Sequence, residues 1–285
     1  MNFFNIISHL AEVDSDVMGR LDSRRAVFSS LTTAGKRVSQ AAVPAMLASF
    51  FSKAYAGTST TIGDPKEVFN YALTLELLEA DFYQKMIASA GFATASPASQ
   101  AAIRQISKHE DAHVALLKAV VLGLGGTPVT GVAFSTAVFN TVTANFLGQL
   151  GVAQLLEDTG VRAYKGRAGD LQGLPDITVG GKVYNPLETA LQIHSVEARH
   201  ASHIRYMRTT LDPTATATRP WITGDGDQDT KDNYKGATPE SNVIQSNVNI
   251  TTGLGTTYTA KDAQASFDEI LTVNEVVALI TPLKQ

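Results

Sequence analysis

Four segments of this chain place glutamates in a repeated pattern: two are single glutamates in apolar stretches, and two are each followed by a histidine three residues later. In sequence order these positions are Glu76, Glu110-x-x-His113, Glu157 and Glu197-x-x-His200. Residues three apart share one face of an α-helix, so each Glu-x-x-His unit presents a carboxylate and an imidazole to a common point. The alternation of a single glutamate with a Glu-x-x-His unit indicates a duplicated two-helix motif. It predicts four helices that direct these side chains toward one centre.

Helical periodicity extends over most of residues 64–210. The first helix is expected over 65–90, because Asp64-Pro65 supplies an N-cap and a first-turn proline. The others are expected over 97–124, 135–165 and 186–210. About ten residues precede the third helix, and they can extend roughly 33–36 Å, enough to follow a helix of about 20 residues. A long crossover is therefore feasible, and it would let the second and third helices run parallel.

Two segments depart from the helical pattern. Residues 177–184 alternate around Gly180-Gly181, which predicts a small β-hairpin between the third and fourth helices. Residues 211–264 are rich in Thr, Asp, Gly and Asn, which indicates an extended wrap over the bundle, with disorder as the alternative. Thr272 and Glu275 form a capping-box pattern, so the C-terminal extension, residues 211–285, is expected to end in a short helix.

The residue types in the four-helix pattern point to metal binding. Four converging carboxylates repel one another unless cations neutralise them, and two divalent ions balance four negative charges. The chain has no cysteine, which excludes thiolate ligands, disulfides and iron–sulfur clusters. Oxygen and imidazole donors with open coordination positions favour iron or manganese. We therefore expect two Fe or Mn ions as cofactors.

Residues 65–210 resemble the ferritin-like superfamily, in which two helices each supply a glutamate and two others each supply Glu-x-x-His. Three motifs resemble its secreted, desiccation-related branch: Leu75-Glu76 through Phe82-Tyr83, Leu156-Glu157 through Tyr164, and Phe267-Asp268-Glu269 with the terminal helix. The resemblance implies an all-α fold, a ferritin-like four-helix bundle over residues 64–210. A long crossover, a small β-hairpin insertion between the third and fourth helices, and a C-terminal extension would complete it.

The same resemblance assigns roles to the site residues. It implies two bridging carboxylates, two terminal carboxylates and one histidine for each ion, which are respectively Glu110 and Glu197, Glu76 and Glu157, and His113 and His200. Members of the superfamily activate oxygen or peroxide, store iron, or have no established activity. The hairpin and the long tail depart from the cage-forming ferritins and count against storage.

Several residues near this pattern have open roles. Tyr83 and Tyr164 each follow a single glutamate by seven residues, so they lie on the same stripe and could hydrogen-bond to ligands or relay electrons. The alternative is that they are ordinary core tyrosines. Glu79 is a fifth carboxylate of the site, a partner that contacts a ligand from outside, or part of a solvated face. The remaining candidates for direct ligands are His109, His194 and His203, with a surface position or a contact to a ligand from outside as their alternatives.

The first 56 residues resemble a twin-arginine export signal. Arg24-Arg25 precedes apolar residues, a mildly hydrophobic stretch covers 41–51, and Ala54-Tyr55-Ala56 has the form of a cleavage site. The stretch is too short and too interrupted for an ordinary transmembrane helix, which needs about 20 apolar residues. An amphipathic N-terminal helix is the alternative. We expect an exported protein, periplasmic or extracellular, without an integral membrane segment in its mature form.

These observations favour a dinuclear iron or manganese protein that acts on small oxygen species, peroxide or dioxygen. The formal net charge of -4 gives no broad electrostatic case for a nucleic-acid partner. Two alternatives remain at this stage, a non-catalytic protein for stress or desiccation protection with structural metals, and an iron-sequestering protein. The sequence is compatible with a homo-oligomer and does not fix the oligomeric state.

Overall fold

The computed structural model describes residues 64–285, apart from 143–144, 213–218, 223, 225–231 and 254–257. The predicted export signal, residues 1–56, lies outside the described residues. Within the described ranges, no helix combines the length and apolar character that crossing a bilayer requires.

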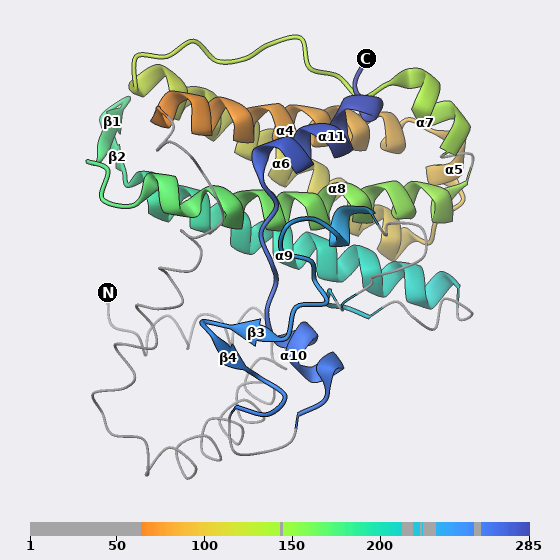
Figure 1. The fold of residues 1–285 in the computed structure, drawn as a ribbon. Helices are drawn as coiled ribbons and strands as arrows, with labels where there is room; N and C mark the ends of the chain where they lie inside the picture. The colour runs from red at the N-terminus through yellow and green to blue at the C-terminus, as the bar shows by residue number, and fades with distance from the viewer. Residues whose placement is uncertain (1–63, 143–144, 213–218, 223, 225–231, 254–257) are drawn as a thin grey trace, which may run out of the picture. The chain divides into compact units, whose positions relative to one another are not determined.

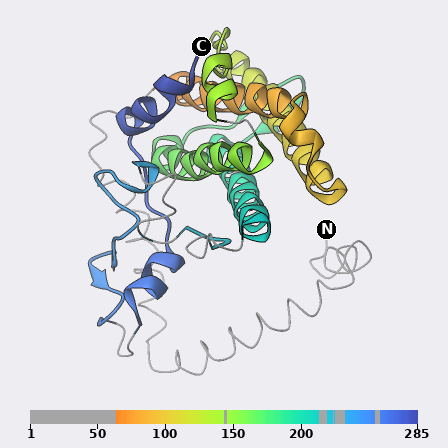
Figure 2. The ribbon, with the colours of Figure 1, turned by 90° about the vertical axis from the view of Figure 1, so that its right-hand side faces the viewer.

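Four long helices form the body of the protein: α4 (Pro65–Ile87), α6 (Pro97–Gly123), α8 (Phe146–Arg167) and α9 (Pro186–Leu211). Each begins at a side-chain cap that accepts a backbone N–H, and the caps are Asp64, Ser96, Asn145 and Asn185. The helices pack in two antiparallel pairs, α4 with α6 and α8 with α9 (Figure 1), and Figure 2 shows the bundle turned by 90°. The predicted four-helix bundle is confirmed.

The prediction of one continuous third helix over residues 135–165 is wrong. It consists of the short helix α7 (Thr136–Val142) and of α8, which begins only at Phe146. Asn145 has an extended backbone, and its side chain accepts the N–H of Gly148 at 2.8 Å. Such a local side-chain cap competes with helix continuation, so the chain changes direction there. A second short helix, α5 (Ala90–Ala93), follows α4 where the first helix was expected to continue.

The long crossover between α6 and α7 is present, and it runs along the bundle in Figure 1. Asn70 of α4 anchors it, because its side chain accepts the N–H of Val129 at 2.8 Å and donates to the carbonyl of Thr127 at 3.0 Å. The crossover brings the chain back to the end where α6 began, so α8 runs parallel to α6. The predicted hairpin is also present, as β1 (Ile177–Val179) and β2 (Lys182–Tyr184), which pair antiparallel.

The C-terminal extension contains more regular structure than an extended wrap. It forms a small antiparallel pair, β3 (Ile244–Gln245) and β4 (Val248–Asn249), a short helix α10 (Ala260–Ser266), and α11 (Val273–Ile280) with a 3-10 turn, η4 (Thr281–Leu283). The capping box at the start of α11 is formed as expected, between Thr272 and Glu275. The last residue is held by the crossover, because Gln285 donates its N–H to Ala133 at 3.0 Å.

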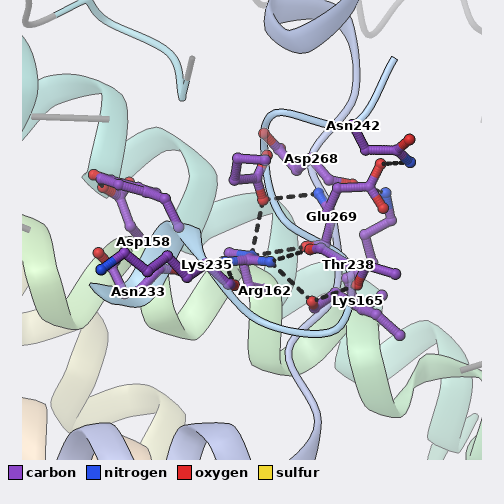
Figure 3. A network of polar contacts seen from close by, with 12 residues as sticks. Asp158, Arg162, Lys165, Asn233, Lys235, Thr238, Asn242, Asp268 and Glu269 are labelled. Carbon is purple, nitrogen blue, oxygen red and sulfur yellow. Dashed lines mark hydrogen bonds and ion pairs between the residues drawn. The ribbon is translucent and has the colours of Figure 1, made fainter. Parts of the chain in front are cut away.

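Arg162 of α8 fastens this extension to the bundle (Figure 3). Its guanidinium pairs with Glu240 at 2.8 Å. The same group donates to five backbone carbonyls, those of Asn233, Lys235, Thr238, Glu269 and Ile270. Gly166, one turn further along α8, allows the close approach, since a β-carbon there would lie 2.3 Å from the Leu271 carbonyl oxygen.

The apolar core is divided into two clusters along the bundle. On α6, one cluster includes Ile103 and Ile106, and the other includes Leu117 and Val121. On α9, Ile204 and Ile193 likewise belong to different clusters. The two Glu-x-x-His units occupy the helix turns between them, so a polar layer separates two apolar ones.

Candidate metal centre

The structure brings the six predicted site residues together between the four long helices. All four glutamates are completely buried, and both histidines are nearly so, with 8% of His113 and 4% of His200 exposed. Their ligand atoms form two groups, each with all atoms within 4.8 Å of one another. One group is Glu76, Glu110, His113 and Glu197, and the other is Glu110, Glu157, Glu197 and His200. The two groups share Glu110 and Glu197.

Helix geometry explains why each residue reaches the centre. Glu110 and His113 lie one turn apart on α6, and Glu197 and His200 lie one turn apart on α9, so each pair shares a face. The single glutamates come from α4 and α8. The repeated motif thus gives both ligand groups the same residue types, one histidine and three glutamates. The pair α4 and α6 and the pair α8 and α9 each supply one single glutamate and one Glu-x-x-His unit.

The two tyrosines hold the single glutamates across the bundle. The hydroxyl of Tyr83 on α4 donates to Glu157 Oε1 on α8, and the hydroxyl of Tyr164 on α8 donates to Glu76 Oε1 on α4. Burial is the main cause that raises the pKa of both phenols well above the usual value, so they remain donors. Each tyrosine therefore orients a carboxylate that belongs to the other helix pair.

More carboxylate oxygens lie near each histidine Nδ1 than one N–H group can hydrogen-bond. Three carboxylate oxygens surround Nδ1 of His113, namely Glu76 Oε2 at 3.0 Å, Glu110 Oε2 at 3.2 Å and Glu197 Oε1 at 3.2 Å. A ring nitrogen carries at most one hydrogen, so it can satisfy only one of them fully. Around His200 the arrangement is similar, with Glu110 Oε1 at 2.9 Å and Glu157 Oε2 at 3.2 Å from Nδ1. The lone pairs of these atoms converge as ligands converge on a cation.

Several of these buried atoms have no hydrogen bond of good geometry within the described residues, although His113 or His200 lies within 3.2 Å of three of the carboxylate oxygens. They are Glu110 Oε1, Glu157 Oε2, both carboxylate oxygens of Glu197, and His200 Nδ1. Within the described residues, no lysine or arginine pairs with the carboxylates of the centre, and only His113 and His200 do so. A buried carboxylate without a hydrogen bond or a basic partner is costly, so this donor set fits bound cations.

The pKa shifts of the buried glutamates and of His113 are consistent with an excess of negative charge at the centre. Burial, assisted by the charge of Glu76, raises the pKa of Glu197 to about 8, and burial likewise raises that of Glu157 to about 8. Burial lowers the pKa of His113, but the surrounding carboxylates outweigh it and raise the value to about 12. Glu76 differs, because its contacts with His113 outweigh burial and lower its pKa. In the absence of a metal ion the centre therefore retains protons at neutral pH.

Glu79 is a fifth buried carboxylate beside the centre, with 2% of its surface exposed. It faces Gly160 of α8 together with Glu197, since a β-carbon at Gly160 would lie 3.7 Å from Glu79 Oε1 and 3.2 Å from Glu197 Oε2. Burial and then the charge of Glu197 raise its pKa well above the usual value. Glu79 is buried, so the solvated alternative is wrong. It is not in either ligand group, and its role beside the centre remains a prediction.

The three other candidate histidines have different surroundings. His109 Nδ1 lies 2.9 Å from His200 Nε2, so it contacts the centre from outside. His203 is exposed and packs near the ring of Tyr206, whereas His194 is partly buried with no hydrogen-bond partner for Nδ1. The sequence could not single out His109, because its partner lies 91 residues away on another helix.

A four-helix bundle whose interior is lined by carboxylates and histidines in two Glu-x-x-His units defines the ferritin-like class of metalloproteins. The family model for the ferritin-like domain matches residues 63–210, slightly more than half of the chain. The chain belongs to this family. A search of the curated proteins found no significant match. The predicted membership in a secreted, desiccation-related branch remains a prediction.

Proposed function

We propose that the protein binds two iron or manganese ions in the bundle and acts on a small oxygen species, hydrogen peroxide or dioxygen. The observation that supports this most is the pair of overlapping ligand groups that share Glu110 and Glu197. Each position then has one histidine and three carboxylates. This donor set favours iron and manganese over metals that prefer thiolates.

The charges of the centre support two ions rather than one. Glu76, Glu110, Glu157 and Glu197 carry four negative charges when ionised, and two divalent cations neutralise them. With a single divalent ion, two buried negative charges would remain for the two histidines to balance. Redox-active iron or manganese would supply electron exchange with the oxygen species, which carboxylates and imidazoles cannot provide.

The residues of the chain would perform the remaining tasks. Glu110 and Glu197, which belong to both ligand groups, would hold both ions, and the two tyrosines orient the single glutamates. The apolar clusters on both sides exclude bulk water. Glu79, with its raised pKa, holds a proton next to Glu197, where a reduced oxygen species would need one.

Elemental mass spectrometry of the purified protein tests the metal-binding part. We expect about two iron or manganese ions per chain, and a loss of at least one ion in Glu110→Gln and Glu197→Gln. The matched control is Glu188→Gln, which changes an exposed glutamate of α9 and should retain both ions. A protein that takes up neither metal after reconstitution would refute the proposal.

Gas and peroxide measurements test the reaction. We expect the metal-loaded protein to consume hydrogen peroxide, with release of dioxygen if it disproportionates peroxide, or to consume dioxygen when a reductant is supplied. The metal-loaded Glu188→Gln protein should have the same rate as the unchanged protein. If two metals bind and neither substrate is consumed, the metals are structural.

We further propose that the protein is exported through the residues at its N-terminus. The support is the Arg24-Arg25 pair with the following apolar stretch and Ala54-Tyr55-Ala56. In a bacterial host with a twin-arginine pathway, the full chain should reach the periplasm or the medium. Replacement of both arginines, Arg24→Lys with Arg25→Lys, should keep it in the cytoplasm, and equal export of that variant would contradict this proposal.

A further inference from the structure

A hydrogen-bonded chain of three side chains leads from the surface of α6 to the candidate ligand His200 on α9. Gln105 is exposed, and its side-chain amide lies 2.7 Å from Nε2 of His109. His109 is partly buried, and its Nδ1 lies 2.9 Å from Nε2 of His200. The other nitrogen of His200, Nδ1, is the one that faces the carboxylates of the centre.

The two imidazoles meet edge to edge. Their ring planes differ by only 8°, and their centroids are 5.1 Å apart while the two nitrogens are 2.9 Å apart. The distance between the centroids exceeds the distance between the nitrogens by about one ring diameter, that is, one ring radius on each side. The two nitrogens therefore lie on the line between the centroids, and the two rings lie nearly in one plane. This is the geometry of a direct N–H···N hydrogen bond between His109 and His200.

The bond has a direction that depends on what His200 Nδ1 binds. Without a cation, a hydrogen on Nδ1 can face the carboxylates, and Nε2 then accepts from His109. With a cation on Nδ1, the hydrogen of neutral His200 must be on Nε2, which then donates to His109 Nδ1. His109 in turn donates from Nε2 to the carbonyl oxygen of Gln105, whose amide can turn to present it. The chain can therefore complete its hydrogen bonds in both states.

The duplicated motif does not repeat this arrangement. His109 directly precedes Glu110 in the first Glu-x-x-His unit, whereas the residue that precedes Glu197 in the second unit is Val196. Among the described residues, His113 has hydrogen-bond contacts only through Nδ1, and none joins its Nε2 to a protein group. The two ligand groups thus contain the same residue types, but only the histidine of one group, His200, has a hydrogen-bond partner on its outer nitrogen among the described residues.

We propose that His109 is a positioning residue that fixes the tautomer and ring orientation of His200 and thereby makes the two metal positions unequal. The position that includes His200 binds its ion more tightly than it would without His109, and the position that includes His113 does not depend on it. A hydrogen-bond partner behind a metal-binding histidine typically contributes about 10- to 100-fold in affinity. This inference rests on the proposed function, because it requires two bound ions.

Titration of the metal-free full-length protein with Mn²⁺, with free Mn²⁺ measured by electron paramagnetic resonance, tests the inference. The unchanged chain should bind two Mn²⁺. His109→Phe should bind one Mn²⁺ with unchanged affinity and the second about 10- to 100-fold more weakly. His109→Gln, which retains a hydrogen-bond acceptor and donor, should recover most of that loss. The matched control is His203→Phe, which changes an exposed histidine of α9 and should leave both affinities unchanged.

A spectroscopic signature separates positioning from a general structural effect. In the Zn²⁺-loaded protein labelled with ¹⁵N-histidine, His200 should show a hydrogen on Nε2 that exchanges slowly in the unchanged chain and in His109→Gln. In His109→Phe that hydrogen should exchange rapidly.

The outcomes distinguish the two proposals. If the unchanged chain binds neither Mn²⁺ nor, in the same titration, Fe²⁺, the proposed function and this inference both fail. If it binds two and His109→Phe binds two with the same affinities, or weakens both equally, only the role of His109 is refuted.

Discussion

Two buried polar regions lie next to each other on α8, and they balance their charges in opposite ways. Glu157 belongs to the candidate metal centre, whose five buried carboxylates have no lysine or arginine partner among the described residues. The next residue, Asp158, is completely buried too, but Arg205 holds it with two hydrogen bonds and Tyr234 donates to it. Arg162, one turn further on, is neutralised by Glu240 and surrounded by carbonyls (Figure 3).

The comparison shows how burial of charge separates a structural from a functional role. In the region of Asp158 and Arg162, the chain itself supplies the opposite charge, from Arg205 and Glu240, so the region joins the C-terminal extension to the bundle. In the region of Glu157, the chain supplies carboxylates and two histidines as ligand atoms, and among the described residues no lysine or arginine pairs with these carboxylates. A buried set of ligands is stable in that form only when protons or cations complete it.

The largest expected effect comes from neutralising the two adjacent acids in the metal-free protein. Asp158→Asn should lower the free energy of unfolding by about 3–5 kcal/mol, because it leaves the guanidinium of Arg205 buried without its counter-charge. Glu157→Gln should raise it, because it removes one of several mutually repelling carboxylates while keeping the shape. Urea unfolding of both variants measures this. Losses of similar size in both would show that the two regions do not differ.

Removal of the metal ions should lower the free energy of unfolding somewhat less than Asp158→Asn does. At a free metal concentration 100-fold above the dissociation constant, binding stabilises the folded state by about 2.7 kcal/mol, and chelation removes that contribution. The same measurement on Glu110→Gln should show a smaller difference between the metal-loaded and chelated samples. A chelated protein as stable as the loaded one would mean that the folded state gains nothing from the ions.

The free energy of unfolding should fall with rising pH in the metal-free protein and rise with pH in the metal-loaded protein. Folding raises the pKa of Glu157 and Glu197 to about 8, from the ordinary glutamate value of 4.5, chiefly because both are buried. Their contribution to stability is therefore complete below about 4.5 and is lost as pH rises to 8, since the folded state binds more protons than the unfolded state in that window. Metal binding displaces these protons, so metal affinity should increase over the same range. Unfolding midpoints between pH 5 and pH 8, with and without Mn²⁺, measure both slopes.

The smallest expected effect comes from the tyrosines. Tyr83→Phe and Tyr164→Phe should each lower the free energy of unfolding by about 1 kcal/mol, because each removes one hydrogen bond to a buried carboxylate. Each should also weaken metal binding by roughly 10-fold through looser orientation of that carboxylate. Tyr206→Phe, an exposed tyrosine of α9, is the control. Unchanged metal affinity in both variants would favour the ordinary core role for these residues.

The fold was largely predictable because its signals are local. Asp64, Ser96, Asn185 and Thr272 are caps that act on residues within four positions, and the structure begins α4, α6, α9 and α11 at them. The break between α7 and α8 was missed, because Asn145 is both an acceptable helix residue and a cap. The regular elements of the extension were missed too, since β3, β4 and α10 are too short to show a period.

The sequence alone determined the helix faces on which the Glu-x-x-His units lie, because i, i+3 spacing is a property of one helix. It could not determine the contacts that join distant segments. The pairs Tyr83 with Glu157, His109 with His200, and Asp158 with Arg205 each join different helices, and their spacing in the sequence carries no signal. Only tertiary packing decided which buried acids received a basic partner from the chain, because that depends on which side chains the bundle brings within a few ångströms.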